Sequence, residues 1–273
     1  MSGTWYGDAP PDVPLGALGL ARAVLKGIPI FGLVFGGLLL LLVLRCIERP
    51  LFGLSRPMTP YLTVVVCRGT LALMGLRLDV KGRPLKGRGA VVANHSSWLD
   101  IFVLNASKRI YFVSKAEVAN WPGIGWLARA TGTVFIERDR TKAAQQAALF
   151  KTRLGVGHKL LFFPEGTSSD GARVLPFKST LFAAFFDPAL RDTLKVQPVS
   201  VAYTAPHGQD ARFFGWWGDM EFGNHFLRVL AYGAGGRIGV TYHEPLAVSA
   251  FPDRKALAAA CELTVRGGCE AAE

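Results

Sequence analysis

The stretch Ala90-Val91-Val92-Ala93-Asn94-His95-Ser96-Ser97-Trp98-Leu99-Asp100 joins a short apolar run to a polar turn that carries a histidine and a carboxylate. A second stretch, Leu160-Leu161-Phe162-Phe163-Pro164-Glu165-Gly166-Thr167, repeats this arrangement with a carboxylate on its turn. Short apolar runs bounded by turn residues are typical of buried strands. Because functional side chains gather at strand ends in α/β folds, His95 and Glu165 are candidate site residues.

Beyond Leu78, short runs rich in valine and isoleucine alternate with longer segments of helical period. The ranges predicted as strands are 77–80, 90–93, 110–113, 133–137, 159–163, 195–203 and 237–243. The ranges predicted as helices are 98–106, 122–130, 141–156, 180–187, 222–231 and 254–266. This alternation predicts an α/β domain over residues 79–273, with a mixed sheet flanked by helices.

The first 78 residues have a different texture. Residues 1–16 are rich in proline and glycine, which predicts a flexible N-terminus. Residues 27–44 carry no charge, and residues 61–78 form a second apolar segment that Arg68 interrupts. We therefore expect residues 17–78 to form a helical hairpin that anchors the chain to a membrane. The sequence leaves open whether this hairpin enters one leaflet or contains one spanning helix. A signal peptide and a buried core helix fit the long apolar run less well.

The charge balance is strongly basic, with 31 lysines and arginines against 20 acidic residues and a net charge of +11. Next to an apolar anchor, this charge favours attraction to anionic lipid headgroups or to an acidic carrier. The basic residues are dispersed and no nucleic-acid-binding motif is present, so nucleic acid is not an expected partner. The four cysteines lack metal-ligand spacing, which fits a reduced protein that faces the cytosol.

His95 and Asp100 form the first candidate catalytic pair. On one continuous helix they would point about 140° apart and would not meet. If His95 lies in the turn before a helix that Ser96 or Ser97 caps, the imidazole can fold back onto the carboxylate. The carboxylate would then fix the tautomer of the base and stabilise its charged form. The competing interpretation is a capping aspartate beside an incidental histidine.

Further candidates follow the other strands. Arg138 follows the predicted strand 133–137 and can clamp a phosphate or a carboxylate, or it can be an ordinary solvated residue. Glu165 lies on a tight turn in which Gly166 permits close backbone approach and Thr167 supplies a hydroxyl. Two lysines that can face the same site complete the set of substrate-binding candidates: Lys115 and Lys178.

Four ordered stretches resemble the motifs of the glycerolipid acyltransferase family, whose best-known members acylate 1-acyl-sn-glycerol-3-phosphate. In chain order these stretches are Asn94-His95-x-x-x-x-Asp100, Gly132-x-x-Phe135-Ile136-x-Arg138, Phe163-Pro164-Glu165-Gly166-Thr167 and Val196-Gln197-Pro198-Val199. The resemblance implies an α/β catalytic domain behind a two-helix membrane anchor. It also implies action at the cytoplasmic face of a bacterial inner membrane.

The resemblance further implies site roles. His95 would be the general base for the acceptor hydroxyl, and Asp100 would orient it. The hydroxyl would attack the thioester of acyl-carrier protein or acyl-CoA directly, while Arg138, Glu165 and Gly166 bind the acceptor headgroup. No metal and no prosthetic group is expected, and the acyl thioester is a co-substrate.

One departure concerns the acceptor. Family members that act on lysophosphatidic acid usually carry a basic residue directly after Thr167, but here Ser168-Ser169-Asp170 follows. This version resembles enzymes that act on lyso-ornithine lipid, and lysophosphatidic acid remains the alternative acceptor. A non-catalytic lipid-binding protein of the same fold is a more distant alternative. A serine hydrolase is disfavoured, because the chain has no Gly-x-Ser-x-Gly motif.

Overall fold

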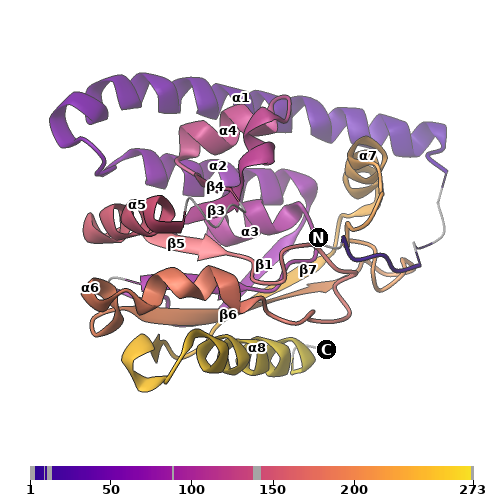
Figure 1. Cartoon of the computed structure of the whole chain (residues 1–273). Helices are drawn as coiled ribbons and strands as arrows, with labels where there is room; N and C mark the ends of the chain where they lie inside the picture. Colours follow the sequence, from indigo (N-terminus) through magenta and orange to yellow (C-terminus); the bar gives the residue numbers. More distant parts are fainter. Residues whose placement is uncertain (1–3, 9, 11–13, 88, 138–142, 272–273) are drawn as a thin grey trace.

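The computed structural model of the chain describes residues 4–8, 10, 14–87, 89–137 and 143–271 (Figure 1). Its centre is an eight-stranded mixed sheet with the order β1-β7-β6-β2-β5-β3-β4, in which β8 pairs with β6. The strands are β1 (Arg77–Gly82), β2 (Gly89–Ala93), β3 (Tyr111–Lys115), β4 (Val134–Ile136), β5 (Lys159–Phe162), β6 (Lys195–Thr204), β7 (Arg237–Tyr242) and β8 (Leu246–Ala247). The pairs from β6 through β2, β5 and β3 to β4 are parallel, whereas β7 and β8 run antiparallel to β6.

Helices surround this sheet. The α-helices are α1 (Ala17–Phe52), α2 (Thr59–Met74), α3 (Leu99–Ser107), α4 (Ile124–Thr131), α5 (Ala143–Gly155), α6 (Pro188–Arg191), α7 (Phe222–Tyr232) and α8 (Arg254–Glu270). Among the described residues, the 3-10 helices are η1 (Ala116–Asn120), η3 (Ser179–Phe186) and η4 (Val248–Ala250). The predicted mixed α/β fold is therefore confirmed.

Several local elements differ from the sequence-based expectation. Residues 180–187 were expected to form an α-helix, but η3 is a 3-10 helix over Ser179–Phe186. Side chains three residues apart in a 3-10 helix point the same way, so Phe182 and Phe185 enter one core cluster together. The short elements η1, α6 and β8 were not predicted, since two to five residues give too little periodic pattern.

The two faces of the sheet bury alternate residues of each strand. Val91 and Ala93 of β2 pack with α1, α2, α3 and α7, whereas Ala90 and Val92 pack with α5, η3 and α8. This alternation is the period-2 pattern of a strand, and helices on both faces explain why β2 is apolar throughout. In Figure 1, α1 and α8 lie on opposite sides of the sheet.

The parallel register brings two polar turns to one edge of the sheet. Val92 of β2 is paired with Phe162 of β5, so the residues that follow these strands emerge side by side. Those residues are Asn94-His95 after β2 and Phe163 to Glu165 after β5. The carboxyl edge of the parallel strands is where ligands bind in α/β folds.

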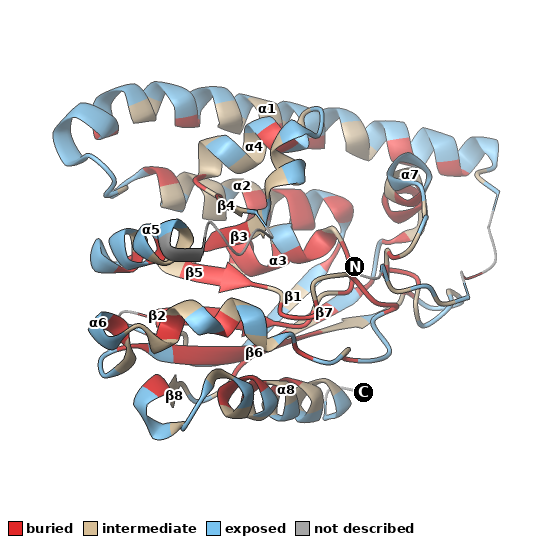
Figure 2. Cartoon of the chain, in the orientation of Figure 1, coloured by how far each residue is buried: buried red, intermediate tan, exposed pale blue. Residues whose placement is uncertain are grey.

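Helix α1 contacts the domain through one narrow strip of buried residues. Of the described helices it alone has the length and hydropathy to cross a membrane. Its buried residues recur at spacings of four and seven: Gly19, Ala23, Ile30, Val34, Leu41 and Glu48. Large apolar side chains such as Leu25, Phe31 and Leu39 are more than half exposed on the rest of the helix. Figure 2 shows this exposed outer surface along the whole of α1. An apolar surface of this extent marks a membrane or protein contact.

Helix α2 joins α1 to the domain. Gly37 of α1 and Gly69 of α2 lie at the helix crossing, where a Cβ atom would come within 2.6 Å of Val66 and 2.7 Å of Leu33 respectively. Arg68, which interrupts the second apolar segment, donates from Nε to the Ala106 carbonyl at 2.8 Å. The guanidinium of Arg68 is therefore hydrogen-bonded to the carboxyl-terminal end of α3. The two helices form the expected hairpin, although α2 is too short to cross a membrane.

The buried carboxylate of Glu48 holds the turn of this hairpin. Its Oε1 accepts from the backbone N–H groups of Met58 at 2.5 Å and Thr59 at 3.0 Å, and its Oε2 accepts from the Thr59 hydroxyl at 2.7 Å. Arg45, one turn earlier in α1, pairs with the same carboxylate at 3.3 Å. Glu48 thus caps the start of α2 from the end of α1.

Replacing Glu48 by alanine is expected to lower the free energy of unfolding by about 2–4 kcal/mol, because buried N–H groups would lose their acceptor. Chemical denaturation of the purified protein in detergent measures this loss. The matched control is Glu244→Ala, since Glu244 is exposed. Equal losses in the two variants would contradict the capping role.

Candidate active site

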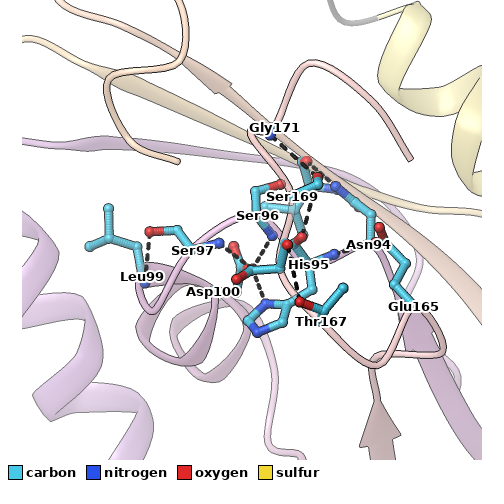
Figure 3. Close-up of polar contacts among 12 residues, drawn as sticks. Asn94, His95, Ser96, Ser97, Leu99, Asp100, Glu165, Thr167, Ser169 and Gly171 are labelled. Carbon is cyan, nitrogen blue, oxygen red and sulfur yellow. Dashed lines mark hydrogen bonds and ion pairs between the residues drawn. The ribbon is translucent and has the colours of Figure 1, made fainter. Parts of the chain in front are cut away.

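His95 and Asp100 meet at the carboxyl edge of the sheet (Figure 3). The imidazole Nδ1 lies 2.7 Å from Asp100 Oδ2. Asp100 is fully buried, whereas the His95 side chain keeps 22% of its surface exposed. In the part of the chain that the structure describes, no group is hydrogen-bonded to His95 Nε2. The pair therefore presents one free imidazole nitrogen beside a buried carboxylate.

Asp100 has four donors. Besides His95, its Oδ2 accepts from the backbone N–H groups of Ser96 at 2.8 Å and Ser97 at 3.1 Å. Its Oδ1 accepts from the Tyr203 hydroxyl of β6 at 2.5 Å. Burial and the adjacent negative charge raise the pKa of Tyr203 well above its ordinary value, so the phenol remains a donor. Since the Asp100 oxygens are the acceptors in all four contacts, the proton of the neutral imidazole lies on Nδ1, which leaves the lone pair on Nε2.

The turn differs in one detail from the expected serine cap. Helix α3 begins at Leu99, and no side chain caps it through its N-cap residue Trp98. Ser97 Oγ accepts only from the Leu99 N–H at 3.3 Å, while the side chain of Asp100 binds the preceding N–H groups. The Asp100 carboxylate therefore orients the His95 imidazole and also stabilises the turn on which His95 lies.

Glu165 holds the same turn from the other strand. Its Oε1 accepts from the His95 N–H at 2.6 Å, and its Oε2 accepts from the Leu175 N–H at 2.8 Å. The side chain is 1% exposed. Burial raises the pKa of this carboxyl to about 8, against the lowering effect of the two N–H groups. Both of its oxygens bind backbone N–H groups, so Glu165 positions His95, and the headgroup contact expected of it stays a prediction.

Two further contacts restrain the His95 turn. The Ser169 N–H donates to the His95 carbonyl at 2.9 Å, and the Trp216 N–H donates to the Ser96 carbonyl at 2.8 Å. The Phe163 ring stacks on the imidazole, with ring centroids 4.1 Å apart and planes 12° apart. The ring of His95 is therefore held by Asp100 on its edge and by Phe163 on its face.

The other predicted site residues that the structure describes lie on loops or at a strand end. Gly166 has φ 71°, a backbone conformation that favours glycine, and Thr167 follows it on the loop beside His95 (Figure 3). Lys178 is exposed, and its backbone N–H donates to the Pro164 carbonyl at 2.9 Å. Lys115 is the exposed last residue of β3. Arg138 lies outside the described residues.

Sequence reasoning did not identify Tyr203 or Asn94 as site residues. Asn94 exchanges two 2.8 Å hydrogen bonds with the Val201 backbone of β6 and so fixes the His95 turn to the next strand. Tyr203 lies 103 residues from its partner Asp100. Its place near the carboxyl end of β6, which runs parallel to β2, is the signal that marks it. Ser96 Oγ is buried and has no hydrogen-bond partner among the described residues.

The described residues at the N-terminus have no regular secondary structure, but they lie on the site loops. The Trp5 N–H donates to Thr167 Oγ1 at 3.4 Å, and the Trp5 ring lies 5.9 Å from that of Trp217. The Arg173 guanidinium lies over the Trp5 ring at 5.2 Å. Trp217 Nε1 donates to the Gly7 carbonyl at 3.1 Å. This N-terminal strap, residues 4–8, therefore joins the loop after β5 to the loop before α7.

Comparison with known proteins agrees with this geometry. The acyltransferase family pattern matches residues 77–202. A lyso-ornithine lipid O-acyltransferase of Rhodobacter capsulatus is 57% identical over 265 residues, which span 97% of this chain and 96% of that protein. This chain belongs to the acyltransferase family. It is an enzyme of acyl transfer, and the matched range of this chain includes His95, Asp100 and Glu165.

The names of other relatives of this acyltransferase refer to two different acceptors. A lyso-ornithine lipid O-acyltransferase of Pseudomonas aeruginosa is 33% identical, with coverage of 90% of this chain and 92% of that protein. A 1-acyl-sn-glycerol-3-phosphate acyltransferase of Neisseria meningitidis is 38% identical over 50% of this chain and 53% of its own length. The solved 1-acyl-sn-glycerophosphate acyltransferase of Thermotoga maritima has the same fold. Its TM-score is 0.65 at 22% identity, with 92% of this chain and 95% of that chain covered.

Tyr203→Phe is expected to lower kcat by about tenfold, because Asp100 Oδ1 would lose a hydrogen bond of roughly 1.5 kcal/mol or more. The carboxylate would also be held less firmly against His95. Steady-state kinetics measure kcat, and denaturation curves measure the stability of the variant. A fall in protein stability with an unchanged kcat would leave Tyr203 a purely structural role.

Glu165 predicts a pH dependence of stability. The unfolded carboxyl ionises near pH 4.5, whereas the folded one keeps its proton until about pH 8. Folding therefore takes up a proton between these values, and the stability contribution is full below pH 4.5 and lost as pH rises towards 8. Relative to Glu165→Gln, wild-type stability should fall by about 3–5 kcal/mol over this window. Denaturation curves at several pH values measure the difference, and parallel curves for the two proteins would refute it.

Proposed function

We propose that this acyltransferase transfers a fatty acyl chain from acyl-carrier protein or acyl-CoA to the free hydroxyl of lyso-ornithine lipid. The observation that carries the chemistry is the 2.7 Å contact of His95 Nδ1 with the buried Asp100 carboxylate, which leaves Nε2 open. The observation that favours the acceptor is the 57% identity to the Rhodobacter capsulatus protein over nearly the whole chain.

In the proposed reaction, His95 Nε2 takes the proton of the acceptor hydroxyl while its oxygen attacks the thioester carbonyl. The new C–O ester bond forms, the C–S bond breaks, and the imidazolium returns its proton to the leaving thiolate. Asp100 stabilises the imidazolium between these two transfers. The reaction is balanced without a cofactor or a covalent acyl-enzyme.

The loop after Thr167 supports an acceptor without a phosphomonoester. Arg173 is the basic side chain nearest in sequence, and its guanidinium pairs with the buried Asp170 carboxylate at 3.1 Å. The same guanidinium is stacked on Trp5. Because Asp170 already balances this charge, Arg173 has little charge left for a doubly charged phosphate. A headgroup of lower negative charge fits this loop better.

Lysophosphatidic acid remains the second candidate acceptor. The Neisseria meningitidis relative bears a name for that activity, although it matches only half of this chain. The two acceptors share a free hydroxyl beside an acyl chain, so the His95 chemistry is the same for both. They differ in headgroup charge, so the identity of the acceptor has to be tested separately from the acyl-transfer mechanism.

Membrane attachment through α1 and α2 completes the proposal. Helix α1 is about 54 Å long at 1.5 Å per residue, longer than the 30 Å core of a bilayer. It packs against α2, α4 and α7 along its length. A perpendicular span would carry these elements into the bilayer, so we propose that α1 lies along one leaflet. The catalytic domain would then act at the cytoplasmic face of a bacterial inner membrane.

The purified protein is expected to acylate lyso-ornithine lipid with a higher kcat/KM than lysophosphatidic acid. His95→Ala should lower kcat for either acceptor by about 100-fold or more, because the general base is lost. Mass spectrometry of the diacylated product measures both. The matched control is His207→Ala at an exposed position, which should keep full activity and vesicle binding. Full activity of His95→Ala would refute the mechanism, and a preference for lysophosphatidic acid would refute the acceptor.

A further inference from the structure

A cavity of about 220 Å³ lies at the edge of the sheet opposite to His95. It is bounded by the turn between α1 and α2 and by the first residues of two strands, Tyr111 of β3 and Lys159 of β5. In Figure 1 the β5 arrow points away from this turn, towards the edge that carries the active site. The cavity is therefore separate from the acyl-transfer site.

The lining of this cavity is strongly basic. Four of its residues carry a positive charge and none of its lining residues is acidic. The four residues, here called the basic cavity residues, are Arg56, Lys108, Arg109 and Lys159. They come from the α1–α2 turn, from the segment between α3 and β3, and from the start of β5. Three segments distant in sequence thus direct positive charge to one place.

Two arginines of the cavity are fixed by contacts with uncharged groups, and the more distant Glu48 carboxylate also attracts Arg56. Arg56 Nη1 donates to the Ala130 carbonyl at 2.7 Å, and Arg109 lies over the Tyr61 ring at 4.3 Å. Neither contact supplies a carboxylate. Across the described residues, no salt bridge involves Lys108 or Lys159. An anion would complete this arrangement.

The lysines are also close enough to repel. Burial, followed by the charges of Arg109 and Lys86, lowers the pKa of Lys108. Burial, followed by the charges of Lys108 and Arg109, lowers the pKa of Lys159. Like charges held together without a partner destabilise the folded state, and a bound anion removes this repulsion.

Exposed apolar side chains lie close in sequence to the cavity lining. Val156 lines the cavity, Tyr61 holds Arg109, and the others lie at the end of α1 or in the α1–α2 turn: Leu51, Phe52, Leu54 and Met58. These side chains continue the apolar surface that α1 presents along its length (Figure 2). A basic cavity next to an exposed apolar surface matches a lipid, whose charged headgroup lies directly above its acyl chains.

We propose that the basic cavity residues bind the phosphate of an anionic phospholipid headgroup at the membrane surface. The site adjoins the α1–α2 membrane attachment proposed above, but its headgroup contacts depend neither on that apolar attachment nor on the acyl-transfer chemistry. An acidic carrier protein fits less well, because a carrier docked here would present its thioester at the edge opposite to His95. The lipid would hold the domain at a fixed depth and orientation, so that the other edge meets its acceptor.

Vesicle binding tests this site. The probes are phosphatidylcholine vesicles, and phosphatidylcholine vesicles that contain phosphatidylglycerol. Wild-type protein is expected to bind the second kind more tightly. The variant Lys108→Gln/Lys159→Gln should bind them about 30-fold more weakly than wild type, the combined effect of two lysines at an anionic surface. Its binding to pure phosphatidylcholine should not change, which also shows that the variant is folded.

The matched control is Arg254→Gln/Lys255→Gln, which removes the same charge from the start of α8 across the sheet from α1 (Figure 1). This control should keep wild-type binding to both kinds of vesicle. Equal losses in the two variants would mean that net charge alone matters, and would overturn the site. If wild type binds only the anionic vesicles, through the two lysines, the apolar attachment fails and the site stands. If it binds neither kind, both proposals fail.

Two further probes distinguish the sources of an anion. Inorganic phosphate shares the chemistry of the headgroup, so any rise in Tm that it causes should be larger for wild type than for the lysine variant and should accompany the weakened binding of that variant to anionic vesicles. A rise in Tm for wild type alone, with the lysine variant still binding anionic vesicles as wild type does, would identify a soluble phosphate site and overturn the lipid assignment. If the lysine variant has a raised KM for acyl-carrier protein but binds vesicles as wild type does, the cavity is a docking site for the carrier. That result would also overturn the lipid assignment.

Discussion

The carboxylate of Asp100 is the interaction on which the catalytic centre depends. It is fully buried, and its donors come from the His95 imidazole, from two backbone N–H groups and from the phenol of β6. A buried charge that loses donors is costly by several kcal/mol, so these groups cannot move independently. The histidine is therefore placed by the folding of the turn itself. Glu165 adds a second constraint from β5, because it holds the backbone of His95.

The sequence predicted the strands that build the site, because β2 and β5 are short apolar runs that end in polar turns. It also predicted that His95 and Asp100 meet, since only a turn before the helix can bring them together. It did not predict the partners of Glu165, which are backbone N–H groups that no residue pattern identifies. It also missed Tyr203, because a contact across 103 residues depends on strand order. The sequence also did not predict which residues of α1 face the domain, because apolar residues cover every side of that helix.

The two edges of the sheet have different chemical character. The carboxyl edge presents one polar turn with buried carboxylates, and the amino edge presents unbalanced positive charge. Helix α1 runs from α7, which lies near the first edge, to the turn above the second (Figure 1). An enzyme whose acceptor and product are both lipids benefits from this layout. If α1 lies along one leaflet as proposed, its apolar surface would place both edges at the same depth, so headgroup binding and acyl transfer would need no large domain movement.

The N-terminal strap has a practical consequence. Trp5 contacts Thr167 and Arg173 on the loop after β5, and its ring is 5.9 Å from Trp217 on another loop. A purification tag joined at the amino terminus would lie beside these loops, whereas one joined after α8 would lie at the other end of the chain. The two neighbouring indoles also form an intrinsic fluorescence reporter. Their emission will register any displacement of the strap as an acceptor lipid enters.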